Sequence, residues 1–263
     1  MKDYVSFSTW SNYQDCEFAA LARDKGELEF ETTEPMIVSK YIEANLIGTE
    51  EDIKKVQEEH PEMMNSRTGE PKVAYTRALK AVEEAKEDMI FMTMLQGEKQ
   101  VKLEGVIDGV KVLGYADNVG KAFISDLKAV ANLNRVWDER ERRRVSFVEN
   151  RNYAVQGWLY LEMYRQMTGD ELNFYLAVLT KEDPSKRVIV TFDQESMNYA
   201  ETMFRSDLRR IIELREGRAK PIKCGQCEYC VKNSTTSLVD SRLVGMSRFE
   251  LRAYQEYLEK EGG

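Results

Sequence analysis

The feature that most constrains the fold is a stretch of β-type sequence, residues 100–130, that stands between segments of helical periodicity. Its sequence is QVKLEGVIDGVKVLGYADNVGKAFISDLKAV. Turn residues at Asp108-Gly109 and at 118–121 divide it into three runs, and Asp-Gly is a strong hairpin signal. The stretch therefore predicts three consecutive strands in a sheet that the neighbouring helices flank.

Helical and strand-like periodicity continue on both sides of these strands. Before them, the pattern predicts helices over 8–25, 35–46, 49–60 and 73–95. After them, it predicts a helix over 147–168, strands over 172–181 and 186–193, a helix over 194–217 and a terminal helix over 247–260. This order predicts a single α/β domain over residues 1–263, with a central mixed β-sheet flanked by helices.

The composition is that of an acidic globular protein, since 42% of the residues are hydrophobic and the formal net charge is −8. No apolar run approaches the roughly 20 residues of a membrane span, and the first residues lack the basic-then-apolar order of a signal peptide. We therefore expect a cytoplasmic protein with reduced cysteines and no membrane partner.

Two basic clusters stand out against this acidic balance, which by itself disfavours a nucleic-acid partner. Residues 205–223 hold seven basic and three acidic side chains, with Arg209 and Arg210 among them, and residues 140–144 read RERRR. Either cluster can bind a polyanion, or it can be a solvated helix face.

Three charged side chains occupy strand positions where apolar residues are expected: Asp117, Asp126 and Lys128. Residues i and i+2 of a strand share a face, so Asp126 and Lys128 are neighbours, and a tight turn can bring Asp117 beside them. Two such carboxylates repel unless a cation lies between them, and oxygen ligands suit Mg²⁺ or Mn²⁺. With an ammonium beside the ion, this set indicates metal-assisted phosphodiester hydrolysis. The alternative is that Asp117 closes a turn and that Asp126 pairs with Lys128 at a sheet edge.

The helix predicted over 147–168 carries a polar pair on an otherwise apolar surface. Gln156 and Tyr160 lie one helical turn apart in NYAVQGWLYLEMY and share a side of the helix. If this side faces the sheet, both can hydrogen-bond a DNA phosphate or base. Otherwise Gln156 simply faces solvent.

Taken in order, the motifs GYAD (114–117), SDLK (125–128) and QGWLY (156–160) resemble those of the PD-(D/E)XK nucleases of the RecB-like branch. The likeness runs from about Ser8 to Cys230, and it is greatest to the RecE-like exonucleases of phages and prophages. It implies a restriction-endonuclease-like core.

The resemblance also implies roles for individual residues. Asp117 and Asp126 would be ligands of the catalytic metal, the carbonyl of Leu127 would complete the metal's shell, and Lys128 would be the catalytic lysine. The branch's Q-x-x-x-Y motif matches Gln156 and Tyr160, which implies that they contact DNA beside the site.

Many relatives place a histidine on an early helix as a further metal ligand. Here residues 38–46 fit that helix and carry Glu43 at the candidate position, where a carboxylate would still bind a hard cation. The one histidine of the chain, His60, is the weaker candidate because it lies in EEHPEMM, flanked by acidic residues and followed by proline.

The cysteines are distributed unevenly, with Cys16 near the start and Cys224, Cys227 and Cys230 together in KCGQCEYC. Two successive C-x₂-C steps bring three thiolates around one point, and in a reducing compartment this indicates metal rather than disulfides. An iron-sulfur cube or a zinc ion needs a fourth ligand, which Cys16 can supply. The alternative is four unliganded thiols.

The cysteine pattern also resembles that of the AddB-like nucleases, in which one cysteine before the core and three after it hold a [4Fe-4S] cluster. This likeness implies that a cluster joins the helix 8–25 to the segment 220–235. The two-residue last spacing leaves zinc open. Either metal would be structural.

These observations together predict a Mg²⁺-dependent exonuclease that degrades linear double-stranded DNA from its ends, with the basic helix following the DNA backbone. The family likeness adds phage-type recombination, a single-strand annealing recombinase as partner and a homo-oligomer. Two alternatives stay open: a four-cysteine nuclease of the CRISPR-adaptation type, and a non-catalytic DNA-binding or assembly module with a structural metal cluster.

Overall fold

The structure is a computed structural model that describes residues 3–138 and 142–234 and, beyond them, residues 243, 245–246, 250–251, 253–254 and 257. Its strands are β1 (Glu98–Ile107), β2 (Val110–Val119), β3 (Phe123–Val130), β4 (Val136–Asp138), β5 (Arg143–Val145), β6 (Asn173–Thr180) and β7 (Arg187–Thr191). Its helices are α1 (Phe7–Asp15), α2 (Glu17–Asp24), α3 (Glu34–Leu46), α4 (Glu50–Glu59), the 3₁₀ turn η1 (Pro61–Met63), α5 (Val73–Lys86), α6 (Met89–Thr93), α7 (Phe147–Asn150), α8 (Tyr153–Thr168), α9 (Gln194–Arg215) and α10 (Glu228–Lys232). No helix among the described residues is long and apolar enough to cross a membrane.

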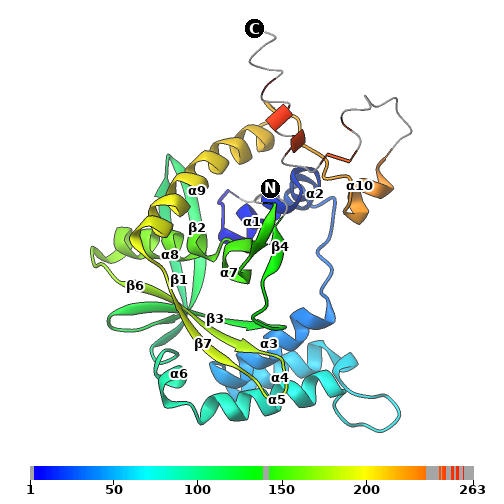
Figure 1. Cartoon of the computed structure of the whole chain (residues 1–263), viewed down its shortest axis with the longest axis vertical. Helices are drawn as coiled ribbons and strands as arrows, with labels where there is room; N and C mark the ends of the chain where they lie inside the picture. Colours follow the sequence, from blue (N-terminus) through cyan, green and yellow to red (C-terminus); the bar gives the residue numbers. More distant parts are fainter. Residues whose placement is uncertain are drawn as a thin grey trace.

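A five-stranded mixed sheet in the order β1-β2-β3-β6-β7 forms the centre of the molecule (Figure 1). The first three strands are the antiparallel meander that the sequence predicts. β3 then pairs in parallel with β6, and β7 returns antiparallel at the edge. A parallel pair needs a long crossover connection, and α7 and α8 lie in that connection. The expected central mixed sheet is confirmed.

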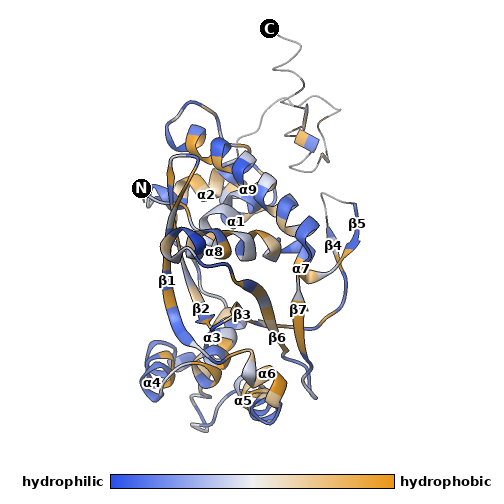
Figure 2. Ribbon diagram, turned by 90° about the vertical axis from the view of Figure 1, so that its left-hand side faces the viewer, coloured by the Kyte–Doolittle hydropathy of each residue, from blue (hydrophilic) through white to orange (hydrophobic). Residues whose placement is uncertain are grey.

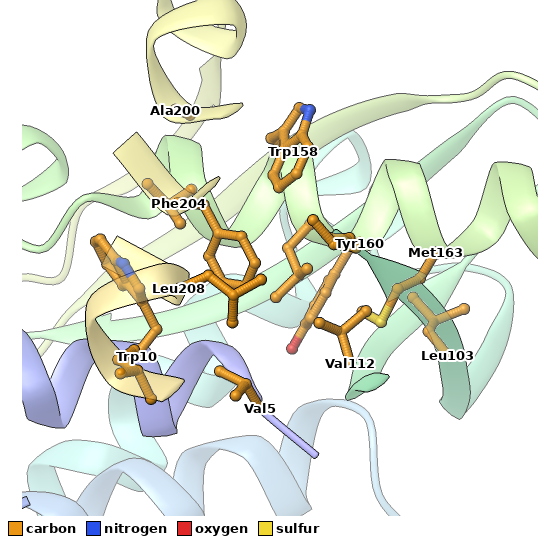
Figure 3. Close-up of a cluster of buried hydrophobic side chains, with 14 of the residues drawn as sticks. Val5, Trp10, Leu103, Val112, Trp158, Tyr160, Met163, Ala200, Phe204 and Leu208 are labelled. Carbon is orange, nitrogen blue, oxygen red and sulfur yellow. The ribbon is translucent and has the colours of Figure 1, made fainter. Parts of the chain in front are cut away.

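Helices cover both faces of the sheet, with α8 and α9 on one side and α3 to α6 on the other (Figure 1 and Figure 2). α8 packs directly on β1, β2 and β6, and α9 packs on α8. The core on this side contains Trp10, Met163 and Phe204, which are fully buried, and Figure 3 shows how α1, α8 and α9 contribute to it. The opposite core contains Ile42, Tyr75 and their neighbours from α3 and α5.

α8 approaches the sheet so closely that one position on it admits only glycine. A Cβ atom added at Gly157 would lie 2.3 Å from Cδ1 of Phe174 on β6, well inside van der Waals contact. Because interiors are close-packed, this contact sets the distance between α8 and β6. It therefore also sets how far the neighbouring side chains of α8 reach across the sheet.

The predicted helix over 8–25 is interrupted, which the periodicity did not indicate. Cys16 adopts an extended conformation with φ −166° and ψ 111°, ends α1 and starts α2. Its Sγ atom accepts a hydrogen bond from the N–H of Ala19 in the first turn of α2. The interruption leaves the Cys16 thiol at a helix N-terminus rather than along a helix side.

Other predicted boundaries also differ from the structure. The helix predicted over 73–95 divides at Asp88, whose side chain caps α6, and the helix over 147–168 divides at Asn152, where φ is +53°. The small sheet of β4 and β5 was not predicted. The terminal helix predicted over 247–260 falls largely outside the described residues.

Candidate active site and cysteine centre

The strands β2 and β3 separate where the charged residues lie. They pair only at Asn118–Ser125 and Val119–Ile124, whereas the β3–β6 ladder extends from residue 123 to residue 130. Past Ser125 the two strands diverge, and we call this opening the fork. Asp117 lies inside β2 at the fork, so the prediction that it could merely close a turn is wrong.

The Asp117 carboxylate takes the place of a main-chain partner across the fork. The N–H of Leu127 donates to Asp117 Oδ2 over 2.9 Å. The N–H and C=O groups of one strand residue point to the same side of the strand. The carbonyl oxygen of Leu127 therefore faces the fork as well, beside Asp117.

Asp126 lies on the central strand β3, with only 2% of the residue exposed. Its Oδ1 atom accepts a hydrogen bond from Gln156 Nε2 at 2.7 Å, and its Oδ2 atom lies 2.5 Å from Lys128 Nζ. The sequence left open that Asp126 merely pairs with Lys128 at a sheet edge. The ion pair is present, but it lies on the middle strand of the sheet and not at an edge. Two charges are rarely buried at such a position without a further role.

Lys128 stays positively charged in this environment. Burial disfavours its ammonium, but the charge of Asp126 outweighs burial and raises the pKa of Lys128 above its usual range. The Nζ atom also lies 5.1 Å from the centre of the Tyr153 ring, within the range of a cation–π contact. The side chain therefore presents a fixed ammonium rather than a proton acceptor.

Glu43 joins the same set from α3 through a residue that the sequence analysis missed. Gln100 Nε2 donates to Glu43 Oε1 over 3.0 Å and to Asp117 Oδ1 over 3.3 Å. Gln100 lies between the β1–β2 pairs Lys99–Asn118 and Val101–Ala116 and is not itself paired in this register. Its φ is +51°, which is rare for a residue with a side chain. Strained backbone of this kind concentrates at functional sites. A lone glutamine at the start of a predicted strand carries no sequence signal for this role.

His60, the weaker candidate for the early ligand, lies apart from this set. It ends α4, and its Nδ1 atom contacts Glu62 Oε1 at 3.0 Å. Of the two candidates, only Glu43 meets the fork within the part of the chain that the structure describes.

Burial, reinforced by repulsion from the neighbouring carboxylates, raises the pKa values of Asp117 and Glu43. Burial, the charge of Asp126 and the charge of Glu43 raise the pKa of Asp117 to about 8. Burial and the charge of Asp126 also raise the pKa of Glu43. Buried acids with raised pKa values favour a cation between them, and their oxygen atoms are the donors that Mg²⁺ and Mn²⁺ prefer. The amide of Gln100 and the ammonium of Lys128 now link the three groups, and the carboxylates would exchange these partners for an ion.

Gln156 faces the sheet, so the alternative in which it faces solvent is wrong. Besides its bond to Asp126, its Nε2 atom lies 3.0 Å from the hydroxyl of Tyr160, which in turn donates to the carbonyl of Tyr115 over 2.9 Å. The Q-x-x-x-Y pair therefore anchors Asp126 from α8. Contact of the pair with DNA stays a prediction.

A cleft with a volume of about 1210 Å³ opens beside these residues. Lys128, Gln156 and Tyr160 line it, together with residues of α1, the start of α3, β2 and the loop that follows β3. The further polar and charged side chains along the cleft are Ser6, Ser8, Ser11, Asn12, Asp15, Ser39, Asn132, Asn134, Asn150, Arg151 and Lys181. The cleft thus gives the Lys128 ammonium access to solvent along a surface on which basic side chains outnumber acidic ones.

The two arginines predicted to bind DNA lie on α9, which α8 separates from the sheet (Figure 2). Arg209 is exposed. Arg210 Nη2 pairs with Glu17 Oε2 at 3.0 Å and also donates to the carbonyl of Lys220 over 2.9 Å. Arg210 thereby ties α9 to α2, and DNA contact by either arginine stays a prediction.

The four cysteines converge as predicted, with their Sγ atoms all within 4.8 Å of one another. The Sγ atom of Cys230 lies 3.5 Å from that of Cys16 and 3.8 Å from that of Cys224. Figure 1 shows α2 and α10, whose N-termini carry Cys16 and Cys227, beside each other. Within the described part of the chain, these are the acidic, histidine or thiol groups that gather most tightly for a metal ion.

Main-chain N–H groups donate hydrogen bonds to the sulfur atoms of Cys224 and Cys227. The N–H of Cys227 donates to Cys224 Sγ over 3.3 Å, and the N–H of Cys230 donates to Cys227 Sγ over 3.4 Å. Burial opposes ionisation of Cys224, but the N–H groups of Cys227 and Gln226 and hydrogen bonds with the thiols of Cys227 and Cys16 lower its pKa to about 7. Burial raises the pKa of Cys16 and of Cys230. Four soft donors at these separations fit a thiolate-bound metal.

A mixed sheet between two helical layers, with acidic groups and a lysine at a fork between its central strands, defines the PD-(D/E)XK class. The chain matches the family described as PDDEXK-like domain of unknown function (DUF3799) over residues 6–233, and it belongs to this family.

A solved structure supports the same fold. The crystal structure of a "Putative exonuclease" from Eubacterium rectale is 25% identical to this chain, with a TM-score of 0.84, and the match covers 93% of this chain and 94% of that one. No curated protein matches the sequence. The restriction-endonuclease-like fold is therefore confirmed, and the family and the neighbour support a nuclease. Membership of the RecE-like branch stays a prediction.

Proposed function

We propose that this protein is a Mg²⁺-dependent deoxyribonuclease that hydrolyses linear double-stranded DNA from its ends in the cytoplasm. The observation that carries the proposal is the fork, where Glu43, Asp117 and Asp126 gather around the Lys128 ammonium beside an open cleft. The description of the Eubacterium rectale neighbour as an exonuclease supports the choice of exonuclease within the nuclease class.

Glu43, Asp117, Asp126 and the carbonyl of Leu127 are the residues that would hold the divalent ion. When bound, such an ion lowers the pKa of a water molecule and neutralises charge on the scissile phosphate. The Gln156 amide holds Asp126 in place for this purpose.

Lys128 supplies a positive charge next to the reacting phosphate. Its ammonium stays charged, and burial beside Tyr153 keeps it in one position. A fixed positive charge next to the reacting phosphate stabilises the negative charge that develops in the transition state, at no cost of reorganisation. Lys128 would thus also orient the attacking water rather than remove its proton.

We propose that the cysteine centre binds a structural metal that joins α2 to α10 within a single domain. The four Sγ atoms lie within 4.8 Å of one another, so the thiolates can share one metal centre. The cysteine pattern favours a [4Fe-4S] cluster, in which each thiolate binds a different iron, and a tetrahedral zinc ion is the alternative.

The resemblance to RecE-like exonucleases extends the proposal to a biological setting. It supports phage-type recombination, in which the protein resects DNA ends for a single-strand annealing recombinase. It also supports assembly as a homo-oligomer. Size-exclusion chromatography with light scattering, with and without such a recombinase, would test both points.

The decisive experiment compares wild type with Asp126→Ala on linear duplex DNA in Mg²⁺. We expect the wild type to release nucleotides from the ends, to leave covalently closed circles intact, and to lose at least about a hundredfold in rate on substitution, since a charged metal ligand is removed. Cleavage of closed circles would indicate an endonuclease. Equal and negligible rates for both proteins would favour a non-catalytic module.

A further inference from the structure

Lys181 is a partly buried lysine whose hydrogen-bond partners are both neutral. It follows β6, and its Nζ atom donates to the carbonyl of Pro35 over 2.8 Å and to Ser39 Oγ over 2.9 Å. Burial lowers the pKa of Lys181, and among the described residues no carboxylate charge offsets that effect. A desolvated ammonium is costly unless an anion compensates it.

Two nearby lysines differ from Lys181, because each of them pairs with a carboxylate of the fold. Lys80 Nζ pairs with Asp183 Oδ1 at 2.5 Å, and Lys186 Nζ pairs with Glu182 Oε2 at 3.1 Å, both at the loop that follows β6. Acidic residues are therefore available in this loop, yet Lys181 points away from them toward the first turns of α3. Its charge is left for a partner that is not part of the fold.

The position of Lys181 indicates where that partner lies. Lys181, Pro35 and Ser39 line the same cleft as Lys128. The main-chain N–H of Lys181 donates to the carbonyl of Val130 over 2.8 Å, so the residue lies where the parallel strands β3 and β6 end together. Val130 is two residues beyond Lys128, which in a strand is about 7 Å. The two ammonium groups therefore belong to one continuous surface.

We propose that Lys181 binds a phosphate group of the nucleic-acid substrate other than the scissile one, with Pro35 and Ser39 as the residues that position its ammonium. An ammonium has three N–H donors, of which these two contacts use two, and the third is left for a phosphate oxygen. Phosphate contacts of this kind fix the register of a strand without reading its sequence. The proposal rests on the proposed nuclease function and adds a substrate-positioning site to it.

The test uses Lys181→Ala and Lys181→Arg, with Lys186→Ala as the matched control from the same loop. Binding to a short duplex is measured by fluorescence anisotropy with Ca²⁺ in place of Mg²⁺ to suppress cleavage, over salt concentrations of about 50 to 200 mM. For Lys181→Ala we expect about tenfold weaker binding and a loss of about 0.9 from the slope of log affinity against log salt. Lys181→Arg should recover most of the affinity, and Lys186→Ala should match wild type.

Kinetics and end chemistry separate a positioning role from a structural one. In Mg²⁺ we expect Lys181→Ala to raise KM by about tenfold and to change kcat by less than about threefold. A comparison of duplexes with 5′-phosphate ends and duplexes with 5′-hydroxyl ends shows whether Lys181 binds a terminal or an internal phosphate. If Lys181 binds a terminal phosphate, the preference for phosphorylated ends disappears in Lys181→Ala, whereas equal losses on both duplexes assign an internal phosphate.

Wild-type protein provides a second test in case Lys181→Ala does not fold. Acylation of lysines by an N-hydroxysuccinimide ester, read by peptide mass spectrometry, should decrease at Lys181 but not at Lys186 when duplex DNA and Ca²⁺ are present. Undiminished acylation of Lys181, or an active wild type whose affinity and KM survive Lys181→Ala, overturns the inference while leaving the nuclease proposal intact. A wild type that neither binds nor cleaves DNA overturns the nuclease proposal itself.

Discussion

Substitution of Gly157 by alanine should separate the stability of this protein from its activity. Gly157 lies on α8 between the residues that anchor Asp126, and an added Cβ would lie 2.3 Å from Phe174 Cδ1, whereas ordinary contact begins at 3.4 Å. Because the core around Phe174 is tightly packed, α8 must move outward by about 1 Å. The bond from Gln156 Nε2 to Asp126 Oδ1 would then lengthen from 2.7 Å to roughly 3.7 Å and be lost.

Two opposing contributions determine how Gly157→Ala changes the free energy of unfolding. Alanine favours a helix over glycine by about 1 kcal/mol, while overpacking a core costs about 1–3 kcal/mol. The net loss of about 1 kcal/mol lowers the Tm by roughly 3 °C for a chain of this size. A 1 Å displacement of catalytic groups reduces the rate by up to about a hundredfold, so kcat should fall far more than stability does.

The assay pairs thermal melting with exonuclease kinetics for Gly157→Ala, for Phe174→Ala and for the double variant. Phe174→Ala removes Cγ, Cδ1 and Cε1, the three ring atoms that the added methyl group would meet, so the double variant should recover activity relative to Gly157→Ala although it is less stable. A Gly157→Ala protein with a raised Tm and full activity would show that α8 is not held at its distance by this contact, and the reasoning would be wrong.

Two further predictions concern the groups around the fork and the cysteine centre. Gln100→Gly relieves the backbone strain of a positive φ and removes the amide between Glu43 and Asp117. We expect the free energy of unfolding to stay equal or rise by up to about 1 kcal/mol. Because an ion no longer has to displace this amide, the Mg²⁺ concentration for half-maximal cleavage should fall by up to about tenfold. An unchanged Mg²⁺ titration would contradict this role. Cys16→Ser should reduce bound zinc or iron, measured by elemental analysis, to less than about half and lower the Tm by roughly 5 °C, and full retention of metal would exclude Cys16 as a ligand.

Strong local signals made much of the fold predictable. Turn residues and alternation placed the meander of β1 to β3, and the motif order placed Asp126, Lys128 and Gln156 on elements that do meet. Four cysteines separated by most of the chain were also predicted to converge, and they do. In each case the chemistry of a few residues limited the possible arrangements.

Features set by tertiary contact could not be predicted in the same way. Gln100 joins the site only because its amide reaches Asp117 on β2 and Glu43 on α3, and neither contact is visible in a local pattern. The helix break at Cys16 places its thiol 3.5 Å from that of Cys230 on α10, which comes more than two hundred residues later. Arg210 belongs to a basic run, yet its partner Glu17 comes from a distant helix.

The separation of Cys16 from Cys224 has a consequence for how the protein is made. The first thiol leaves the ribosome 208 residues before the second, which at about 5–20 residues per second is a delay of roughly 10–40 seconds. Throughout synthesis of the sheet, Cys16 has none of its three sulfur neighbours. Capture of the proposed metal by all four cysteines can therefore occur only after Cys230 has been translated, so a chain that terminates before Cys230 lacks the complete ligand set.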